Sequence, residues 1–377
     1  MNALFVLVHE INAIFVDNVI FKEMKGVDGK ITIVDVARRA GVSKGTVDRV
    51  LHNRGEVSAA SAEKVRKAVK ELGYEPNLYA SLLATRTPRM IALLLPRYES
   101  GEYWEKIAQG FDKGGAEAEA LGIHVQKFLY DQYDPVSFDE AAAELLASQP
   151  SGVVLAPLFL RGSTKLVNAL QSKDIPYVYV DSKLEDDGYF AYFGMPMYKS
   201  GYLCACLLTE RCPVESVDEI AVVRIQRDRS RQSDPTVSRR AGFNDYITDH
   251  FPSCRIHNIF IDPSDKDSVD AILEAFFSEH PDIRFVVMFN SRIHLIRNYL
   301  GSHPLPARRV IGFDDLDKNL EMLKDGVVDI LISQHSDMQS HRAVNTLADY
   351  IILHKKPQRR DNYMHMDILT RFNDENY

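Results

Sequence analysis

The chain has 377 residues, of which 45% are hydrophobic and 26% are charged, and its formal net charge at pH 7 is −8. This is ordinary globular composition, and the length excludes a single small domain, so we expect two or three packed units. Its four cysteines, at positions 204, 206, 212 and 254, fit no disulfide or metal-ligand spacing. We therefore predict buried free thiols in a reducing cytoplasm.

Residues 1–29 are apolar enough to suggest a signal peptide or a membrane anchor. His9 and Asp17 interrupt the apolar run, no positively charged region precedes it, and no small-residue cleavage site follows. We therefore predict no membrane span. Met24 opens a natural short lead into the next segment, so we expect translation to start there. The alternative is an extra strand or helix packed on the core, which detection of a native peptide containing Phe15 would favour.

Basic residues concentrate just after this extension. From residue 31 to residue 89, eleven Lys and Arg stand against six Asp and Glu, so this stretch carries about +5 and the remainder of the chain about −13. The asymmetry is confined to one end of an acidic protein. It predicts one anionic partner at that end.

Residues 30–75 are predicted to form a helix-turn-helix unit. Apolar side chains recur at helical spacing up to Ala40, with Thr32 placed as the N-cap. Gly41 supplies a tight turn, Ser43 caps again, and a second short helix follows. A third helix begins near residue 58, and three helices over this length can close a small core. Such a unit is typical of proteins that read DNA.

The segment TIVDVARRAGVSKGTVDRVLHNRGEVS, followed by KVRKAVKELGYEPNLYASLLATR, closely resembles the amino-terminal domain of the lac repressor (LacI/GalR) family. The resemblance covers about residues 31–87. It implies a dimeric transcription regulator whose second helix enters the major groove of operator DNA. It also implies phosphate contacts from Thr32, Ser43 and Thr46, and base contacts from Lys44, Gly45, Arg49 and His52. The arginine can bind guanine through two hydrogen bonds, which discriminate between bases by about 1–3 kcal/mol.

Two positions depart from the family pattern. Asp48 stands where the family usually has a serine near a phosphate, and His52 stands where it usually has an asparagine. A carboxylate is repelled by the phosphate backbone, so we expect Asp48 to turn to Arg49 or to accept from a cytosine amine. Gly45 offers no side chain, so Lys44 should carry more of the sequence readout. These departures predict an unusual operator; for each residue the alternative is a solvated helix face.

Residues 76–89 are predicted to form a linker with a hinge helix. Pro76 ends the third helix, Asn77 can cap a new one, and the apolar segment LYASLLA has no obvious partner in its own unit. The resemblance implies a helix that folds on DNA and inserts Leu83, with Ala80 one turn earlier, into a base step of the minor groove. The alternative is that the two adjacent leucines pack on the following domain.

Residues 90–377 change to apolar runs that alternate with helical stretches. Nine runs have the character of buried strands, from MIALLL at residue 90 to DILIS at residue 329. They predict two parallel sheets covered by helices on both faces. The pattern resembles the type I periplasmic-binding-protein fold, with two lobes and a ligand cleft between them. This resemblance implies three crossings between the lobes, which we expect after Asp181, near Asp314 and near Gln334.

Polar and aromatic residues follow several of these strands, where ligands of parallel sheets bind. Aromatic rings pack against the C–H face of a sugar, and planar polar side chains hold its hydroxyls. The predicted effector-binding residues are Tyr103, Trp104, Asp181, Arg239, Asn290, Asp314 and Gln334. The resemblance implies an aromatic pair at the first two positions and a hydroxyl-binding arginine at the fourth. The alternatives are strand-end caps, surface charges and, for Trp104, core packing. An Arg-rich loop at 227–231 would favour an anionic effector if it faced the cleft.

These observations predict a cytoplasmic regulator, acting as a repressor, that binds operator DNA under the control of a sugar-like effector. Whether the effector induces or co-represses stays open. The rival is a solute-binding transport protein of the same fold, which would need an export signal and no helix-turn-helix. No nucleophile elbow or phosphate loop is present, so we expect no enzyme, no cofactor and no metal. The carboxyl end lacks leucine heptads, which favours a homodimer over a tetramer.

Overall fold

The computed structural model describes residues 31–51, 57–74, 89–185, 188–225, 236–263, 265–303 and 308–373. The chain divides into two compact units, residues 1–84 and 85–377, which are described separately. The N-terminal extension, the Arg-rich loop and nearly all of the predicted linker lie outside the described residues. So do four predicted DNA contacts: His52, Asn77, Ala80 and Leu83.

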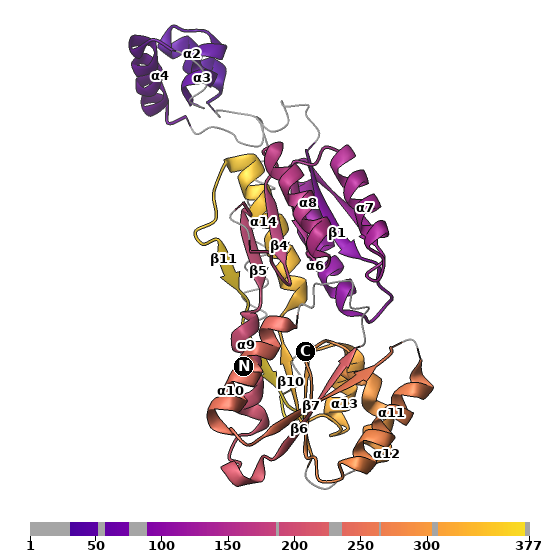
Figure 1. Ribbon diagram of the computed structural model, residues 1–377. Helices are drawn as coiled ribbons and strands as arrows, with labels where there is room; N and C mark the ends of the chain where they lie inside the picture. Colours follow the sequence, from indigo (N-terminus) through magenta and orange to yellow (C-terminus); the bar gives the residue numbers. More distant parts are fainter. Residues whose placement is uncertain are drawn as a thin grey trace. The chain divides into compact units, whose positions relative to one another are not determined.

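The described residues of the first unit form a small bundle of three helices (Figure 1). These are α2 (Ile33–Ala40), α3 (Lys44–Leu51) and α4 (Ala59–Leu72). Val36, Val47 and Val65, one from each helix, are completely buried against one another and form its core. An ion pair between Arg39 and Glu71 links α2 and α4 at the surface. The predicted helix-turn-helix is therefore present.

The caps predicted from the sequence set the ends of these helices. Thr32 Oγ1 accepts from the backbone N–H of Asp35, whose carboxylate in turn accepts from the backbone N–H of Thr32 at 2.9 Å. This reciprocal capping box fixes the start of α2. Gly41 ends it in the left-handed region at φ 65°, which favours glycine. Ser43 Oγ accepts from the backbone N–H of Thr46 at 3.1 Å and caps α3.

The second unit contains two sheets of six strands each (Figure 1), in the orders β11-β5-β4-β3-β1-β2 and β12-β10-β9-β8-β6-β7. The first consists of β1 (Arg89–Pro96), β2 (Ile123–Tyr130), β3 (Gly152–Leu155), β4 (Tyr177–Val180), β5 (Ala191–Gly194) and β11 (Asp361–Tyr363). The second consists of β6 (Glu219–Ile225), β7 (Arg255–Ile261), β8 (Phe285–Met288), β9 (Arg309–Phe313), β10 (Ile330–Ser333) and β12 (Asp367–Leu369). All described pairings are parallel except β10 with β12. This confirms the predicted fold class.

Helices cover both faces of each sheet, and each sheet with its helices forms one lobe. The helices of the first lobe are α6 (Tyr103–Glu119), α7 (Pro135–Ala147), α8 (Leu160–Ser172) and α14 (Ser336–Leu353). Those of the second lobe are α9 (Met197–Leu208), α10 (Val237–His250), α11 (Lys266–Glu279), α12 (Arg297–Ser302) and α13 (Asp317–Lys324), with short 3-10 turns η1 (Val214–Ser216) and η2 (Ile293–Ile296). Among the described residues, no helix combines the length and apolarity needed to cross a bilayer.

All nine predicted strands are present, but only one of the three predicted crossings is correct. The chain crosses between the lobes at residues 195–196 after β5, at Gln334 before α14, and at residues 364–366 between β11 and β12. The first crossing was expected one strand earlier, after Asp181, because β5 was not predicted. The crossing near Asp314 was wrong, because the next helix, α13, packs on β10 of the same lobe.

The cysteines are free thiols, as predicted, but only Cys204 is buried. It packs in the core between α9 and the second sheet. Burial raises the pKa of its thiol far above the usual range, so the thiol stays protonated. The other three are partly exposed, which corrects the expectation that all four are buried.

Candidate functional site

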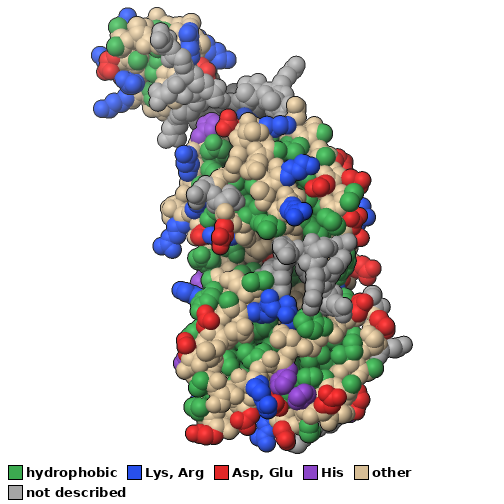
Figure 2. All heavy atoms as spheres, in the orientation of Figure 1, with side chains coloured by type: hydrophobic (Ala, Val, Ile, Leu, Met, Phe, Trp, Pro, Cys, Tyr) green, Lys and Arg blue, Asp and Glu red, His purple; other side chains and the backbone are tan. Residues whose placement is uncertain are grey.

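The first candidate site is the exposed face of α3, the second helix of the helix-turn-helix. Lys44, Gly45 and Arg49 are exposed there, Thr46 is half-buried, and Val47 is the buried residue of this helix. Figure 2 shows Lys and Arg side chains spread over the visible face of this unit. A cationic helix face that is not used for packing can bind anionic DNA.

Gly45 has no packing role in this unit. A Cβ atom at this position would meet no closer neighbour than Ser43 Oγ, at 3.9 Å. Glycine costs about 1 kcal/mol relative to alanine inside a helix. The surface of α3 at Gly45 is therefore open.

The neighbouring polar side chains are already ordered by contacts within the unit. Ser43 Oγ and Thr46 Oγ1 lie 2.9 Å apart, and Arg49 Nε donates to the carbonyl of Gly45 at 3.2 Å. Burial raises the pKa of Tyr74, and the negative charge of Asp48 raises it further. The expected contacts of Asp48 with Arg49 or with a cytosine stay predictions.

The second candidate site is a cleft of about 130 Å³ between the two lobes of the second unit. All seven predicted effector-binding residues line it: Tyr103, Trp104, Asp181, Arg239, Asn290, Asp314 and Gln334. The first two begin α6 and the arginine lies on α10, while the other four follow β4, β8, β9 and β10. The cleft thus lies at the carboxyl ends of the strands, where parallel sheets bind ligands.

On the first-lobe side, Tyr103 and Asp181 form a buried polar pair. The tyrosine hydroxyl donates to Asp181 Oδ1 at 2.6 Å, and the Gln339 side chain accepts from the Asp181 backbone N–H at 2.8 Å. The Tyr192 hydroxyl donates to the Asp181 carbonyl at 3.0 Å. Burial, and then the charge of Asp181, raises the pKa of Tyr103 well above its usual range. The phenol therefore stays a hydrogen-bond donor at neutral pH.

On the second-lobe side, Arg239 is only 4% exposed. Its Nε donates to Ser200 Oγ at 3.0 Å, a terminal nitrogen donates to the Phe289 carbonyl, and the guanidinium lies 3.9 Å from the centre of the Phe313 ring. Burial lowers its pKa, which the charge of Asp314 opposes. These contacts hold one planar cation at the wall of the cleft.

Asp314 and Gln334 complete the polar wall. Gln334 Nε2 donates to Asp314 Oδ1 at 2.8 Å. Burial raises the pKa of Asp314 to about 7, although the charge of Arg239 opposes this shift. Gln334 is 2% exposed, and its Oε1 atom has no hydrogen-bond partner among the described residues. A buried acceptor of this kind is costly unless a ligand or water donates to it.

Trp104 was expected either to line the effector cleft or to pack in the core, and its position fits both interpretations. The rings of Tyr103 and Trp104 meet edge to face, with centroids 5.0 Å apart. Each side chain is 8% exposed and belongs to the core of the first lobe, yet both line the cleft. Trp104 thus packs in the core and presents part of its surface to the cleft.

Sequence reasoning missed a set of charged residues at the rim of the cleft. Arg292, just after Asn290, pairs with Glu102 at 3.1 Å and donates to the Tyr133 hydroxyl at 3.2 Å. These contacts join the two lobes. The only signal for Arg292 in the sequence was its position shortly after β8. Its partner Glu102 lies 190 positions away, and a salt bridge over such a separation leaves no pattern in the sequence.

Comparisons with known proteins match both units. Residues 32–77 match the family model for bacterial regulatory proteins of the lacI family, and residues 91–356 match that for a periplasmic binding protein domain. The chain is a member of the lacI family. In this lacI-family protein, the first matched segment contains α2 to α4, and the second contains most of the two lobes but ends before β11 and β12.

Individual proteins also resemble parts of this chain. A solved structure from Bacteroides fragilis, assigned to the LacI transcriptional regulators, has 32% identity and a TM-score of 0.72, and the match covers 77% of this chain and 100% of that one. The HTH-type transcriptional regulator DegA of Bacillus subtilis is 31% identical over 148 residues, which is 39% of this chain and 42% of DegA. The sucrose operon repressor of Pediococcus pentosaceus is 26% identical over 227 residues, 60% of this chain and 63% of the repressor. The matches thus span less than two thirds of these curated relatives.

Proposed function

We propose that this lacI-family protein is a sequence-specific DNA-binding regulator, acting as a repressor, whose operator affinity is controlled by a small sugar-like effector. The observation that carries this proposal is the buried, unpartnered Oε1 atom of Gln334 in the cleft. A hydroxyl donor from a ligand would satisfy it. Names of similar proteins, including a sucrose operon repressor, support both the regulatory role and the class of effector.

The chemistry of the cleft favours a neutral polyol. Acceptors on Asp181, Asp314 and Gln334 line the cleft together with donors on Arg239 and Asn290, which suits hydroxyl groups that donate and accept at once. Trp104 offers an apolar face for the C–H side of a ring. A volume of about 130 Å³ favours a molecule of monosaccharide size over an oligosaccharide.

Control of DNA binding requires that the effector bind two arrangements of the protein with different affinities. The ion pairs of Arg292 with Glu102 and of Lys106 with Asp315 bridge the lobes and favour the closed cleft. An effector that adds contacts to both lobes strengthens this preference. Coupling of this kind is typically about 1–3 kcal/mol and reciprocal, so operator DNA must change effector affinity by the same factor. We infer a homodimer, which analytical ultracentrifugation tests.

The second candidate is a solute-binding transport protein, which shares the two-lobed fold. The basic three-helix unit and the exposed cationic face of α3 favour the regulator. Three expectations stay predictions: the protein is not an enzyme, it binds no cofactor, and it resides in the cytoplasm.

The test is a gel shift of the full-length protein with the DNA upstream of its own gene, with and without monosaccharides, polyols and uronates. We expect a salt-sensitive, sequence-specific shift that one class of sugar changes. Arg49→Ala should weaken specific binding by about 1–3 kcal/mol. Arg66→Ala on α4, also exposed, is the control and should weaken it much less.

Gln334→Leu keeps the approximate size of the side chain but removes both the unpartnered acceptor and the donor to Asp314. It should retain DNA binding and lose the response to the sugar. Sequence-specific binding in the absence of any sugar response would contradict the effector assignment. No salt-sensitive, specific shift at all would contradict the regulator itself.

A further inference from the structure

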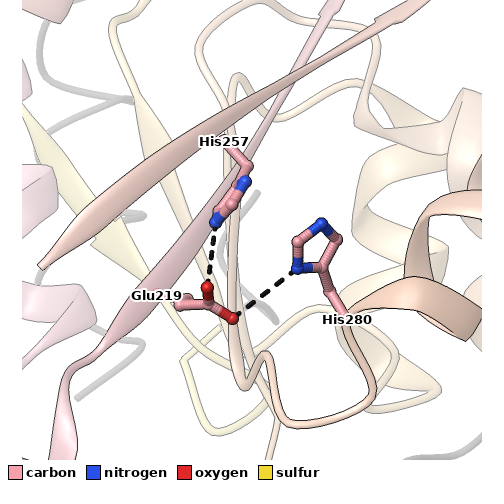
Figure 3. Close-up of side chains that lie close together, drawn as sticks. All are labelled: Glu219, His257 and His280. Atoms are coloured by element: carbon pink, nitrogen blue, oxygen red, sulfur yellow. Dashed lines mark hydrogen bonds and ion pairs between the residues drawn. The ribbon is translucent and has the colours of Figure 1, made fainter.

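Two histidines and one glutamate lie together in the second lobe, outside the residues that line the effector cleft. Glu219 begins β6, His257 lies on β7, and His280 caps the end of α11. One ligand atom from each lies within 4.8 Å of the others. Figure 3 shows both imidazole rings directing a nitrogen at the carboxylate. We propose that this cluster, here called the His-His-Glu site, binds a divalent transition-metal ion of the zinc type.

The distances suit a tetrahedral ion. His257 Nε2 lies 3.2 Å from Glu219 Oε1, and His280 Nδ1 lies 3.7 Å from Glu219 Oε2. Zn²⁺ bound at 2.0–2.1 Å by nitrogen and oxygen ligands holds them about 3.3–3.5 Å apart. The three ligand atoms lie within 4.8 Å of one another, so the side chains must rotate to bring them to the separations that one zinc ion requires. Two imidazoles and one carboxylate form a donor set that zinc accepts, with a fourth position open to water.

Backbone and packing hold the ligands in place before any ion arrives. Residue 219 on β6 is paired with Arg255 on β7, so Glu219 and His257 project from the same face of the sheet. The rings of His257 and His280 have centroids 4.5 Å apart, and Phe276 of α11 contacts both, with centroids at 5.7 and 4.7 Å. Preorganised ligands lose little conformational freedom on binding.

The site is accessible to solvent, and the cation that now pairs with Glu219 is Arg255, whose side chain is largely exposed. The side chains of Glu219, His257 and His280 are 16%, 23% and 28% exposed, so an ion can reach them. Arg255 pairs with Glu219 Oε1 at 2.7 Å, but its side chain is 74% exposed. Exposed ion pairs contribute little to stability, so an incoming divalent ion can displace the guanidinium.

The nearby thiol is a poor alternative ligand. Cys254 precedes Arg255, and metals bind the thiolate form of cysteine. Burial raises the pKa of the Cys254 thiol to about 11, and its sulfur is not among the ligand atoms that lie within 4.8 Å of one another in the cluster. An ion at the His-His-Glu site would join the β6–β7 edge to the end of α11. It would thereby stabilise the folded state by binding it in preference to the unfolded chain.

The test is calorimetric titration of the full-length, chelator-treated protein with Zn²⁺, paired with thermal unfolding. We expect one ion per chain and a rise in unfolding temperature. His257→Gln and Glu219→Gln should each weaken binding by at least about tenfold. His341→Gln is the matched control: His341 also lies 2.9 Å from a glutamate, Glu117, but outside the cluster, and its loss should leave Zn²⁺ affinity unchanged.

Two further measurements keep the proposal falsifiable if a ligand variant fails to fold. Arg255→Ala removes the competing cation and should tighten Zn²⁺ binding. Substitution with Co²⁺ should give a visible spectrum without a thiolate charge-transfer band. A thiolate band, or unchanged Zn²⁺ affinity in folded His257→Gln and His280→Gln variants, would place the ion elsewhere and overturn the proposal. Weaker binding by Arg255→Ala would also overturn it.

Discussion

At Asp314, burial favours the neutral carboxyl group, whereas a hydroxyl donor from a ligand would favour the charged carboxylate. It is 3% exposed, faces Arg239 and Gln334, and lies near the carboxylates of Asp181 and Asp315. Burial raises the pKa of its carboxyl to about 7, so in the absence of ligand it titrates near neutrality. A sugar hydroxyl that donates to this carboxyl would favour its charged form.

The first prediction concerns stability. Because the pKa of Asp314 is raised on folding from about 3.9 to about 7, the folded state binds more protons between these values, and the free energy of unfolding falls as pH rises through this window. Without effector, Asp314→Asn should therefore be more stable than the parent protein at pH 8, by at most about 4 kcal/mol. The difference should vanish near pH 4. Denaturant unfolding at both pH values measures it.

The same substitution separates effector binding from folding. The affinity of the parent protein for a sugar should fall as pH decreases from 8 to 6, because protonation removes an acceptor, whereas Asp314→Asn should bind weakly at every pH. Asp325→Asn, a half-exposed carboxylate outside the cleft, is the control and should keep the pH dependence of the parent. A pH-independent parent would contradict the argument.

The residues that meet in the cleft were predictable because strand ends converge in parallel sheets. Asp181, Asn290, Asp314 and Gln334 each follow an apolar run, and that position alone identified them. The raised pKa of Asp314 was not predictable, because it depends on burial beneath residues distant in sequence. Arg292 was missed for the same reason.

At the scale of elements, the pair α6 and α14 connects the cleft to the first lobe. Helix α6 begins with Tyr103 and Trp104, and α14 begins two residues after Gln334. The two helices pack so closely that a Cβ atom on Gly110 would lie 1.8 Å from the carbonyl oxygen of Asp337. Backbone atoms cannot yield as a flexible side chain does, so this contact requires glycine.

The second prediction follows from this contact. Gly110→Ala should force α6 and α14 apart and lower the free energy of unfolding by about 1–3 kcal/mol or more, despite the higher helix propensity of alanine. Gly301→Ala in α12 is the control: no atom lies within 4 Å of a Cβ there, so the change should be neutral or stabilising by up to about 1 kcal/mol. Chemical denaturation compares the two, and equal stabilities would refute the packing argument.

Strands with a continuous apolar run were predictable even when they have only four residues, as β3, β4 and β8 do. Runs such as MIALLL and IAVVRI specify buried strands by composition alone. Strands β11 and β12 have three residues each and contain acidic residues that hide them, whereas β5 was missed although it is as long as β3 and β4. Because β5 was missed, the first crossing was expected too early.

At the scale of the whole molecule, ion pairs across the cleft link the two lobes. Lys106 on α6 contacts Asp315 Oδ2 at 2.7 Å and its carbonyl at 2.8 Å, and Ser333 donates to the other carboxylate oxygen at 3.0 Å. Both partners of the ion pair are mostly shielded from solvent, with 28% and 15% of the side chains exposed. This shielding makes the pair less sensitive to screening than a surface pair.

The third prediction is that Lys106→Met weakens effector binding by about fivefold, or about 1 kcal/mol, because the closed cleft loses a contact between lobes. Lys127→Met is the control, since Lys127 pairs with Asp112 at 2.7 Å within the first lobe. It should leave effector affinity unchanged. Calorimetric titration of both variants with the sugar found in the screen measures the difference, and equal affinities would contradict the role of the bridge.

The three crossings also affect how this protein folds during synthesis. The hydroxyl of Ser340 on α14 contacts the carbonyl of Ile107, 233 residues earlier, and β11 and β12 are each added to sheets whose other strands precede them. Neither lobe can be completed until residues 336–369 have left the ribosome, whereas the three-helix unit is built from local contacts and emerges early. The contacts of the three-helix unit can therefore form before either lobe has all of its strands.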